Sequence, residues 1–419
     1  MQGGRSAGSE QARASALAVR LAAFFGALFV VLGAQVPFLP VWLDWRGLTP
    51  AEIGIVTATP LMLRLVVTPT IALIADRASL HRQMIILLAW VGLAALLVLT
   101  VCESFWSILL FATISAVCLS SQMPLTETLA MSGVRRAGLD YGRMRLWGSL
   151  TFIATSFIGG AIVDDRGASA GIWVIAFGAL VTVLAAHWLP AREQGLGDEV
   201  ERDGGTRRER AGGGGNPLTA AAVVRFVTSP LMLAFLVAAG AVQSAHAVFY
   251  TFGAVHWRGQ GISATWIGAL WSIGVIVEIV LFMYSGRVVR AIGAVELLIV
   301  AGVAAVVRWT AMAFDPSLAL LVPLQMLHGL TYGAAHVGAM HVLARAVPEW
   351  QAGTAQAVYA TVTAGIGMGG AMLIAGPLYG EWGGRTYLLM AGLALIGLAA
   401  GLVLRTIWRR QGLHRQDTP

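Results

Sequence analysis

The sequence predicts an all-α membrane protein with twelve transmembrane helices in two pseudo-symmetric six-helix bundles. Of its 419 residues, 57% are hydrophobic and only 12% are charged, whereas a soluble domain carries about 25% charged residues. Apolar windows of about 20 residues recur along the chain, the length that a helix needs to cross a bilayer, whereas barrel strands would be about half as long and alternate in polarity. One long charged segment, 191–217, divides the chain into two nearly equal halves.

Each half contains six apolar windows, so we predict an N-terminal bundle over 1–190 and a C-terminal bundle over 218–419. The segment between them has charges of both signs, four consecutive glycines and no apolar face. We interpret it as a solvated cytoplasmic linker, the alternative being a binding loop that orders on a partner. The predicted spans are 17–42, 53–75, 83–102, 106–130, 146–164, 170–190, 229–255, 264–284, 294–313, 317–343, 353–379 and 386–406.

The placement of arginine predicts the orientation. All 28 basic residues are Arg, and the loops on the side of the termini and linker hold most of them. Because cytoplasmic loops carry the excess of basic residues, both termini should be cytoplasmic in a bacterial inner membrane. The same rule explains the net charge of +7 without nucleic acid as a partner. The opposite loops hold only Arg46, Arg166, Arg258 and Arg385.

Several features restrict the kinds of function. No compact basic region with a short apolar core and a cleavage site opens the chain, so we expect the first helix to be retained. Cys102 and Cys118 do not form a metal-ligand spacing, and we expect neither a metal nor a cofactor. Short loops leave no room for a soluble catalytic domain. The function should therefore lie inside the helix bundle, as in transporters whose site is near the middle of the bilayer.

Charged residues inside the spans are few, and such residues are costly in lipid and usually functional. Glu127 and Arg145 flank a short loop that should bring them close together, either as an interfacial ion pair or as a substrate or gating pair. Glu278 lies about 21 Å into its span at 1.5 Å per residue, so it must be paired or neutral. It is a candidate proton carrier, or one member of a buried structural pair with Arg308. The fifth charge is Arg64 in the second span.

Two helices carry polar stripes, each along one helical face. Such stripes favour a water-accessible cavity, although interhelical hydrogen bonds alone are an alternative. Trp271 lies one heptad before Glu278 and could offer a stacking surface to an aromatic or sugar ring. The stripes are Gln243, His246 and Tyr250 in the seventh span, and Gln325, His328, Tyr332 and His336 in the tenth.

Local motifs resemble a known family. The segment IALIADRASLHRQ, with Asp76, Arg77 and Arg82, resembles a degenerate copy of the cytoplasmic gating signature of the major facilitator superfamily, with Ala72 for its leading Gly. The segment YGRMRLWGS contains Gly-Arg-x-Arg-x-x-Gly. Together with PLTETLA, LWSIGVIVEIVLF, VVRWT and QMLHGLTYGAAHVGAM, it resembles the phenylpropionate permease branch, which is similar to lactose permease and the nucleoside symporters.

The resemblance implies the major facilitator fold and roles for individual residues. In lactose permease-like proteins, the residues matching Glu127 and Arg145 bind substrate, and those matching Glu278, Arg308 and His328 join substrate binding to proton coupling. The residue three positions beyond the histidine is a proton-carrying Glu in those proteins and is Thr331 here. Proton symport would therefore depend on Glu278, with His328 or His336.

We expect a monomeric secondary transporter that moves a small organic solute by alternating access, with a proton and in a lipid bilayer. Arg145 and Arg308 favour an aromatic or other organic acid; a sugar or nucleoside is the alternative, and a non-transporting sensor or an efflux carrier stays open. A membrane enzyme would need a nucleophile with its base or a metal cluster, and the sequence shows neither. The expected substrate-binding residues are Glu127, Arg145, Gln243, His246, Tyr250, Trp271, Arg308, Gln325 and Tyr332, and the proton-coupling residues are Glu278, His328 and His336.

Overall fold

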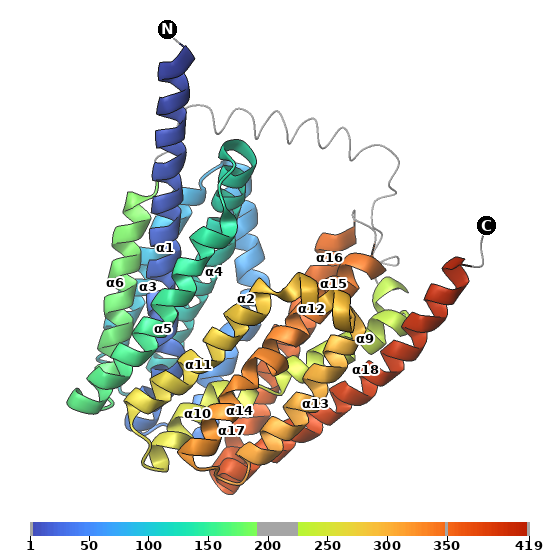
Figure 1. Ribbon diagram of the computed structural model, residues 1–419. Coiled ribbons are helices and arrows are strands. Elements are labelled where there is room, and N and C mark those ends of the chain that lie inside the picture. The colour runs from blue at the N-terminus through green and yellow to red at the C-terminus, as the bar shows by residue number, and fades with distance from the viewer. Residues whose placement is uncertain (1–2, 191–224, 348–350, 417–419) are drawn as a thin grey trace.

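The computed structural model describes residues 3–190, 225–347 and 351–416, and these residues form helices joined by short connections (Figure 1). The predicted linker, 191–217, lies outside the described residues, so the boundaries of the two halves stay a prediction. Six helices precede it, and we call them the N-terminal group. They are α1 (Gly3–Trp45), α2 (Pro50–Ala78), α3 (His81–Leu99), α4 (Phe105–Ala137), α5 (Tyr141–Arg166) and α6 (Ala170–Trp188).

The helices after residue 225 form the C-terminal group, and they are interrupted more often. Its seventh, tenth and eleventh spans each consist of two or three helical segments. The elements are α9 (Pro230–Ser244), α10 (Ala247–Gly259), α11 (Ala264–Met283), α12 (Ser285–Ile292), α13 (Ala294–Met312), α14 (Leu318–Met326), the π-helix η1 (Gly329–Ala334), α15 (Ala335–Ala346), α16 (Ala352–Ala360), the π-helix η3 (Thr361–Gly369), α17 (Gly370–Trp382), the 3₁₀ turn η4 (Gly383–Thr386) and α18 (Tyr387–Gln416).

Eleven helical stretches of the described chain are long and apolar enough to cross a membrane. The last of them, Ala352–Arg410, contains two passes, because the turn η4 separates α17 from α18. The predicted twelve transmembrane helices are therefore confirmed. Both termini lie at one end of the bundle (Figure 1), and we call the opposite end the far end.

Side-chain N-caps stabilise the first turns of α2 and α5, two of the helices that line the cavity. Thr49 and Glu52 form a capping box at the start of α2, where Pro50 occupies a position that needs no backbone donor. The Asp140 side chain accepts from the Arg143 amide at the start of α5. These caps satisfy amide groups that have no partner within the helix.

The two groups meet through close helix crossings toward the far end. A Cβ on Gly268 of α11 would overlap the carbonyl oxygen of Ser156 in α5. Where α2 crosses α17, a Cβ on Gly54 would lie 2.8 Å from the Met372 carbonyl oxygen. Only glycine allows backbones to approach this closely.

The groups separate toward the end that carries the termini. In Figure 1 the helices of the two groups converge at the bottom and diverge at the top. Among the described residues, the hydrogen bonds that join the groups are formed between mid-height and the far end, such as Ser272 Oγ to Ile153 O at 3.3 Å. The protein is therefore closed at the far end.

Candidate functional site

A cavity of about 650 Å³ lies between the two groups. Its wall on one side comes from α1, α2, α4 and α5, and on the other from α9, α10, α11, α14, η1, α15, α16, η3 and α17. Most of the lining is apolar, and a few polar and charged side chains project from both sides. Such composition is typical of a site for a small organic molecule.

The tenth span contributes a column of rings to the cavity wall. His328, Tyr332 and His336 follow one another at intervals of four residues, which keeps them on one face. The rings of His328 and Tyr332 stack with centroids 5.4 Å apart, and those of Tyr332 and His336 stack at 6.4 Å. Gly274 of α11 packs against the His328 ring, so α11 can approach this face closely.

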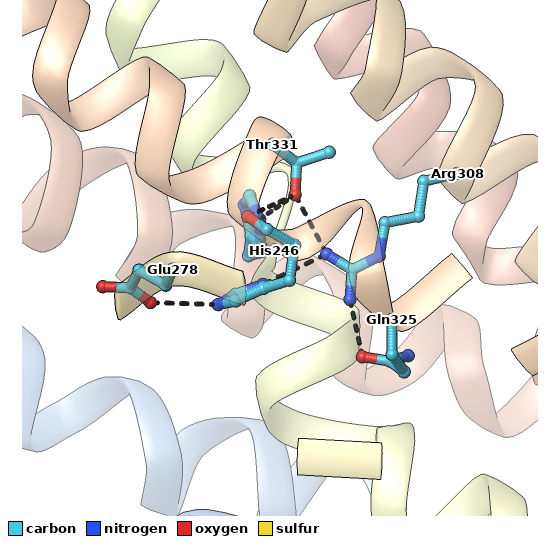
Figure 2. A network of polar contacts seen from close by, with 6 residues as sticks. His246, Glu278, Arg308, Gln325 and Thr331 are labelled. Atoms are coloured by element: carbon cyan, nitrogen blue, oxygen red, sulfur yellow. Dashed lines mark hydrogen bonds and ion pairs between the residues drawn. The ribbon is translucent and has the colours of Figure 1, made fainter. Parts of the chain in front are cut away.

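Arg308 of α13 is fully buried behind this wall, with neutral hydrogen-bond partners (Figure 2). Its guanidinium donates to Gln325 Oε1 at 2.8 Å and to Thr331 Oγ1 at 2.9 Å, and lies 3.1 Å from His328 Nδ1. The guanidinium carbon also lies 4.9 Å from the centroid of the Phe249 ring. The nearby rings and oxygens replace part of the hydration that burial removes.

The partners of this network fix the positions of its protons. His246 Nδ1 lies 3.2 and 3.1 Å from the backbone carbonyls of Val242 and Gln243, which can only accept, so Nδ1 carries the proton. His246 Nε2 then accepts from the Thr331 hydroxyl, 3.1 Å away. Because that hydroxyl also accepts from Arg308, Thr331 uses its donor and an acceptor at once.

His328 connects Arg308 to the cavity acid Glu278. Because arginine only donates, His328 Nδ1 must accept from it, and the neutral imidazole proton then lies on Nε2. That Nε2 faces Glu278 Oε2 at 3.8 Å. Glu278 and Arg308 therefore do not form the direct pair that was one of the two predictions; the His328 ring lies between them.

An aromatic cluster forms part of the wall near this network. The Phe249 and Trp271 rings stack with centroids 4.3 Å apart, and Tyr250 stacks on Trp271 at 5.7 Å. All three line the cavity. They provide an apolar, ring-shaped surface on the C-terminal side.

Two arginines project into the cavity from the N-terminal side. Arg145 of α5 lies over the Phe29 ring, with 4.1 Å between the guanidinium carbon and the ring centroid. Arg64 projects from the middle of α2, and both arginines line the cavity. Among the described residues, no carboxylate lies within 4 Å of either guanidinium.

Four buried polar atoms of lining side chains have no hydrogen-bond partner among the described residues. Two are acceptors, Gln35 Oε1 and Gln243 Oε1, and two are donors, Trp271 Nε1 and Gln325 Nε2. Buried polar atoms are normally satisfied. Their presence in this wall indicates that the cavity receives a polar partner, either water or solute.

The structure brings together most of the predicted site residues, and some of them lie elsewhere. Glu127 is outside the cavity wall, and the Tyr141 hydroxyl, 3.3 Å from Glu127 Oε1, lies between it and Arg145. His246 and Arg308 lie behind the wall. The predicted residues that line the cavity are Arg145, Gln243, Tyr250, Trp271, Glu278, Gln325, His328, Tyr332 and His336.

The predicted gating residues lie at the ends of α2 and α3 and do not line the cavity. Asp76 Oδ1 lies 2.7 Å from His81 Nε2, and Arg77 is exposed. Arg82 donates to the carbonyl oxygens of Leu189 and His187, at 2.8 and 3.0 Å. In this conformation Arg82 joins the start of α3 to the end of α6, and Asp76 joins the end of α2 to the start of α3.

Some lining residues were missing from the predicted set. Arg64 was visible as an isolated charge within a span but had no partner to suggest a role. Gln35 was hidden because a single amide in an apolar helix is common. Tyr359 lies near the end of α16, just before the π-helix η3, and nothing in the sequence distinguishes it from an interfacial tyrosine.

Twelve membrane-crossing helices around a central cavity, whose mostly apolar wall carries a few polar and charged side chains, define a membrane transporter, and the comparisons agree. The chain belongs to the MFS_1-like family, whose model matches residues 18–390. It is therefore a secondary transporter of the major facilitator class and not an enzyme.

Relatives and solved structures of this class cover nearly the whole chain. The probable 3-phenylpropionic acid transporter of Escherichia coli (strain K12) is 31% identical over 88% of this chain and 92% of its own. The maltose permease of Geobacillus stearothermophilus is 26% identical over 93% and 95%. The nucleoside transporter NupG superposes with a TM-score of 0.76 at 16% identity, covering 93% of this chain and 98% of its own, which shows the shared fold.

Proposed function

We propose that this protein is a proton symporter for an aromatic or other organic acid, working as a monomer by alternating access in a bacterial inner membrane with both termini in the cytoplasm. The relative with 31% identity, a probable 3-phenylpropionic acid transporter, supports the substrate class. The Arg-rich loops on the side of the termini support the orientation.

The observation that carries the proposal is the charge of the cavity wall. Two arginines, Arg64 and Arg145, and one acid, Glu278, line the cavity. With neutral histidines, the wall has one more positive than negative charge. In a site with little water, that excess favours an anion over a neutral solute.

The hydrogen-bond network supports Glu278 as the proton carrier. A second proton on His246 would have to enter at Nε2, where the Thr331 hydroxyl already donates. A second proton on His328 would have to enter at Nδ1, which faces the Arg308 guanidinium. In the described part of the chain, Glu278 faces no such donor at 3.5 Å or less, and 20% of its side chain is exposed.

Protonation of Glu278 would also couple the proton to the solute, because it changes the charge of the cavity wall. The Glu278 carboxylate lies within electrostatic range of Arg145 and partly compensates its positive charge. When Glu278 takes a proton, that compensation is lost and the cavity becomes more positive. An anionic solute then binds more tightly, so proton and anion load together.

A sugar or nucleoside is the second candidate. The maltose permease relative and the unpaired amide and indole groups of the wall favour it, because such groups can bind hydroxyls. A sugar would leave the excess positive charge without a counter-ion.

Counterflow in proteoliposomes that contain only this protein tests the choice. Vesicles preloaded with 3-phenylpropionate, maltose or a nucleoside are diluted into the labelled form of the same compound. Accumulation of the carboxylate alone supports the proposal. Accumulation of the sugar or the nucleoside without the carboxylate contradicts it.

We predict that Glu278→Gln abolishes uptake driven by a pH gradient, because an amide cannot carry a proton across the membrane. Counterflow should continue, since exchange needs no net proton movement. Uptake of labelled 3-phenylpropionate with and without an imposed pH gradient measures the first effect. Uptake by the variant that still follows the pH gradient would assign the proton to another residue.

A further inference from the structure

We propose that Arg64 binds the carboxylate of the solute, and that Arg64 and Arg145 together form a two-arginine clamp on the N-terminal side of the cavity. This inference depends on the proposed function, because it assumes an anionic solute. It adds a binding residue from α2 to the site.

The position of Arg64 on α2 directs it away from lipid. Its neighbours Leu63 and Val66 are 45% and 71% exposed, as expected for the lipid-facing side of the helix. Pro60, Leu61 and Arg64 line the cavity instead. Arg64 is the fifteenth residue of a 29-residue helix, so its charge lies near mid-depth, where it cannot reach either membrane surface.

Neither Arg64 nor Arg145 forms a direct ion pair with a described carboxylate, and Glu278 acts on Arg145 only from beyond 4 Å. A charge at this depth needs a partner, and the described residues place no carboxylate within 4 Å of either arginine. Arg308 differs, because three neutral groups hold its guanidinium behind the wall. The anion partners available to a solute are therefore Arg64 and Arg145, in place of the predicted pair Arg145 and Arg308.

The opposite wall gives the solute its orientation. Arg64, Arg145 and Glu278 line the same cavity as Tyr332, and all three lie within electrostatic range of the Tyr332 hydroxyl. The aromatic cluster of Phe249, Tyr250 and Trp271 lies on the C-terminal side.

An aryl-alkyl carboxylate matches this arrangement of charges and rings. Its two oxygens suit the parallel N–H groups of guanidinium, and two arginines can share one carboxylate. Its ring can pack against the aromatic cluster. The solute would then bridge the two helix groups, with its charged end on the N-terminal group and its ring on the C-terminal group.

The test compares a carboxylate with its uncharged amide in nanodisc-reconstituted protein. Titration calorimetry measures the Kd of 3-phenylpropionate and of 3-phenylpropanamide for the wild type, Arg64→Gln and Arg64→Lys. We expect Arg64→Gln to weaken acid binding by about tenfold or more, as loss of a charge-assisted hydrogen bond predicts. Amide binding should change by less than about threefold. Arg64→Lys should weaken acid binding to an intermediate extent, since lysine keeps the charge but lacks the two parallel N–H groups of the guanidinium.

Arg166→Gln is the matched control, because Arg166 is an exposed arginine of the same helix group, bound to Asp165 and outside the cavity. It should bind both compounds as the wild type does. Equal weakening of acid and amide by Arg64→Gln would show a structural role and overturn the inference, as would unchanged acid binding. A wild type that binds neither compound, but binds a sugar, would instead overturn the proposed function, and the inference with it.

Discussion

Thr331 shows how one substitution reshapes a buried polar network. Its hydroxyl accepts from Arg308 and donates to His246, so both buried groups are satisfied by a neutral side chain. The lactose permease-like pattern has a glutamate at this position. With threonine, no acid lies within 4 Å of Arg308 among the described residues, and Glu278 becomes the nearest candidate for proton transfer.

We predict that Thr331→Val destabilises the protein by about 2–6 kcal/mol, because two buried groups each lose a partner at about 1–3 kcal/mol. Thermal unfolding in detergent, compared with the wild type, measures the loss. Thr331→Ser keeps the hydroxyl and should stay close to the wild type. A valine variant as stable as the serine variant would show that the network contributes little.

For individual residues, the sequence shows which side chains belong to the site better than it shows whether each one lines the cavity or lies behind its wall. Charges and imidazoles in apolar helices are rare enough to be noticed, and nine of the twelve predicted binding and coupling residues line the cavity. Helical periodicity alone could not show that Gln325 of α14 projects into the cavity whereas Arg308 of α13 lies behind its wall. That distinction depends on how the helices cross, which no local pattern encodes.

Asp164 illustrates how one helix can hold another across the boundary between the groups. Its carboxylate, on α5, accepts from the Ala264 and Thr265 amides at 2.7 and 2.8 Å and from the Thr265 hydroxyl at 2.6 Å. It therefore caps the first turn of α11, where unpaired amides and the helix dipole favour an anion.

In the wild type, opening at the far end has to break this cap. We predict that Asp164→Ala removes that cost, so that the far end opens more readily. Nitroxide labels at Glu103 and Phe314, in a background with Cys102 and Cys118 replaced by alanine, report the separation of the groups there. The variant should populate longer distances than the wild type. Asp165→Ala, which removes only a neighbouring surface pair with Arg166, is the control. Identical distance distributions for the two variants would contradict the role of the cap.

Span positions were predictable because length and hydropathy are local properties, but the interruptions within spans were not. The seventh span was expected as one helix with Gln243, His246 and Tyr250 on one face. Instead α9 ends at Ser244, and the His246 ring binds the carbonyl oxygens of that turn. This break directs Gln243 and Tyr250 into the cavity and His246 away from it.

At the scale of the whole molecule, the glycine crossings determine which end is closed. A Cβ at Gly268 would overlap the Ser156 carbonyl oxygen, whereas a Cβ at Gly370 would meet no described atom outside its own stretch of helix within 4 Å. We predict that Gly268→Ala forces α5 and α11 apart and favours opening at the far end, and that Gly370→Ala does not.

Labelling of a cysteine at Leu39, which lines the cavity, tests this prediction. A membrane-impermeant maleimide applied from the side opposite the termini should react faster in Gly268→Ala than in the wild type or Gly370→Ala. Unchanged labelling in all three would show that the crossing tolerates a methyl group without opening.

The two helix groups also differ in regularity, with a consequence for how the carrier changes shape. Helices α1 to α6 run without π or 3₁₀ interruption, whereas two π segments, η1 and η3, lie in the cavity wall of the C-terminal group. A π turn holds an extra residue, so its conversion to α geometry would rotate the following residues by about 100°. Such a rewinding of η1 would carry the His336 ring out of register with His328. The C-terminal group would then remodel its own wall while the N-terminal group presents a fixed surface, so the two halves of the cycle would not be mirror images.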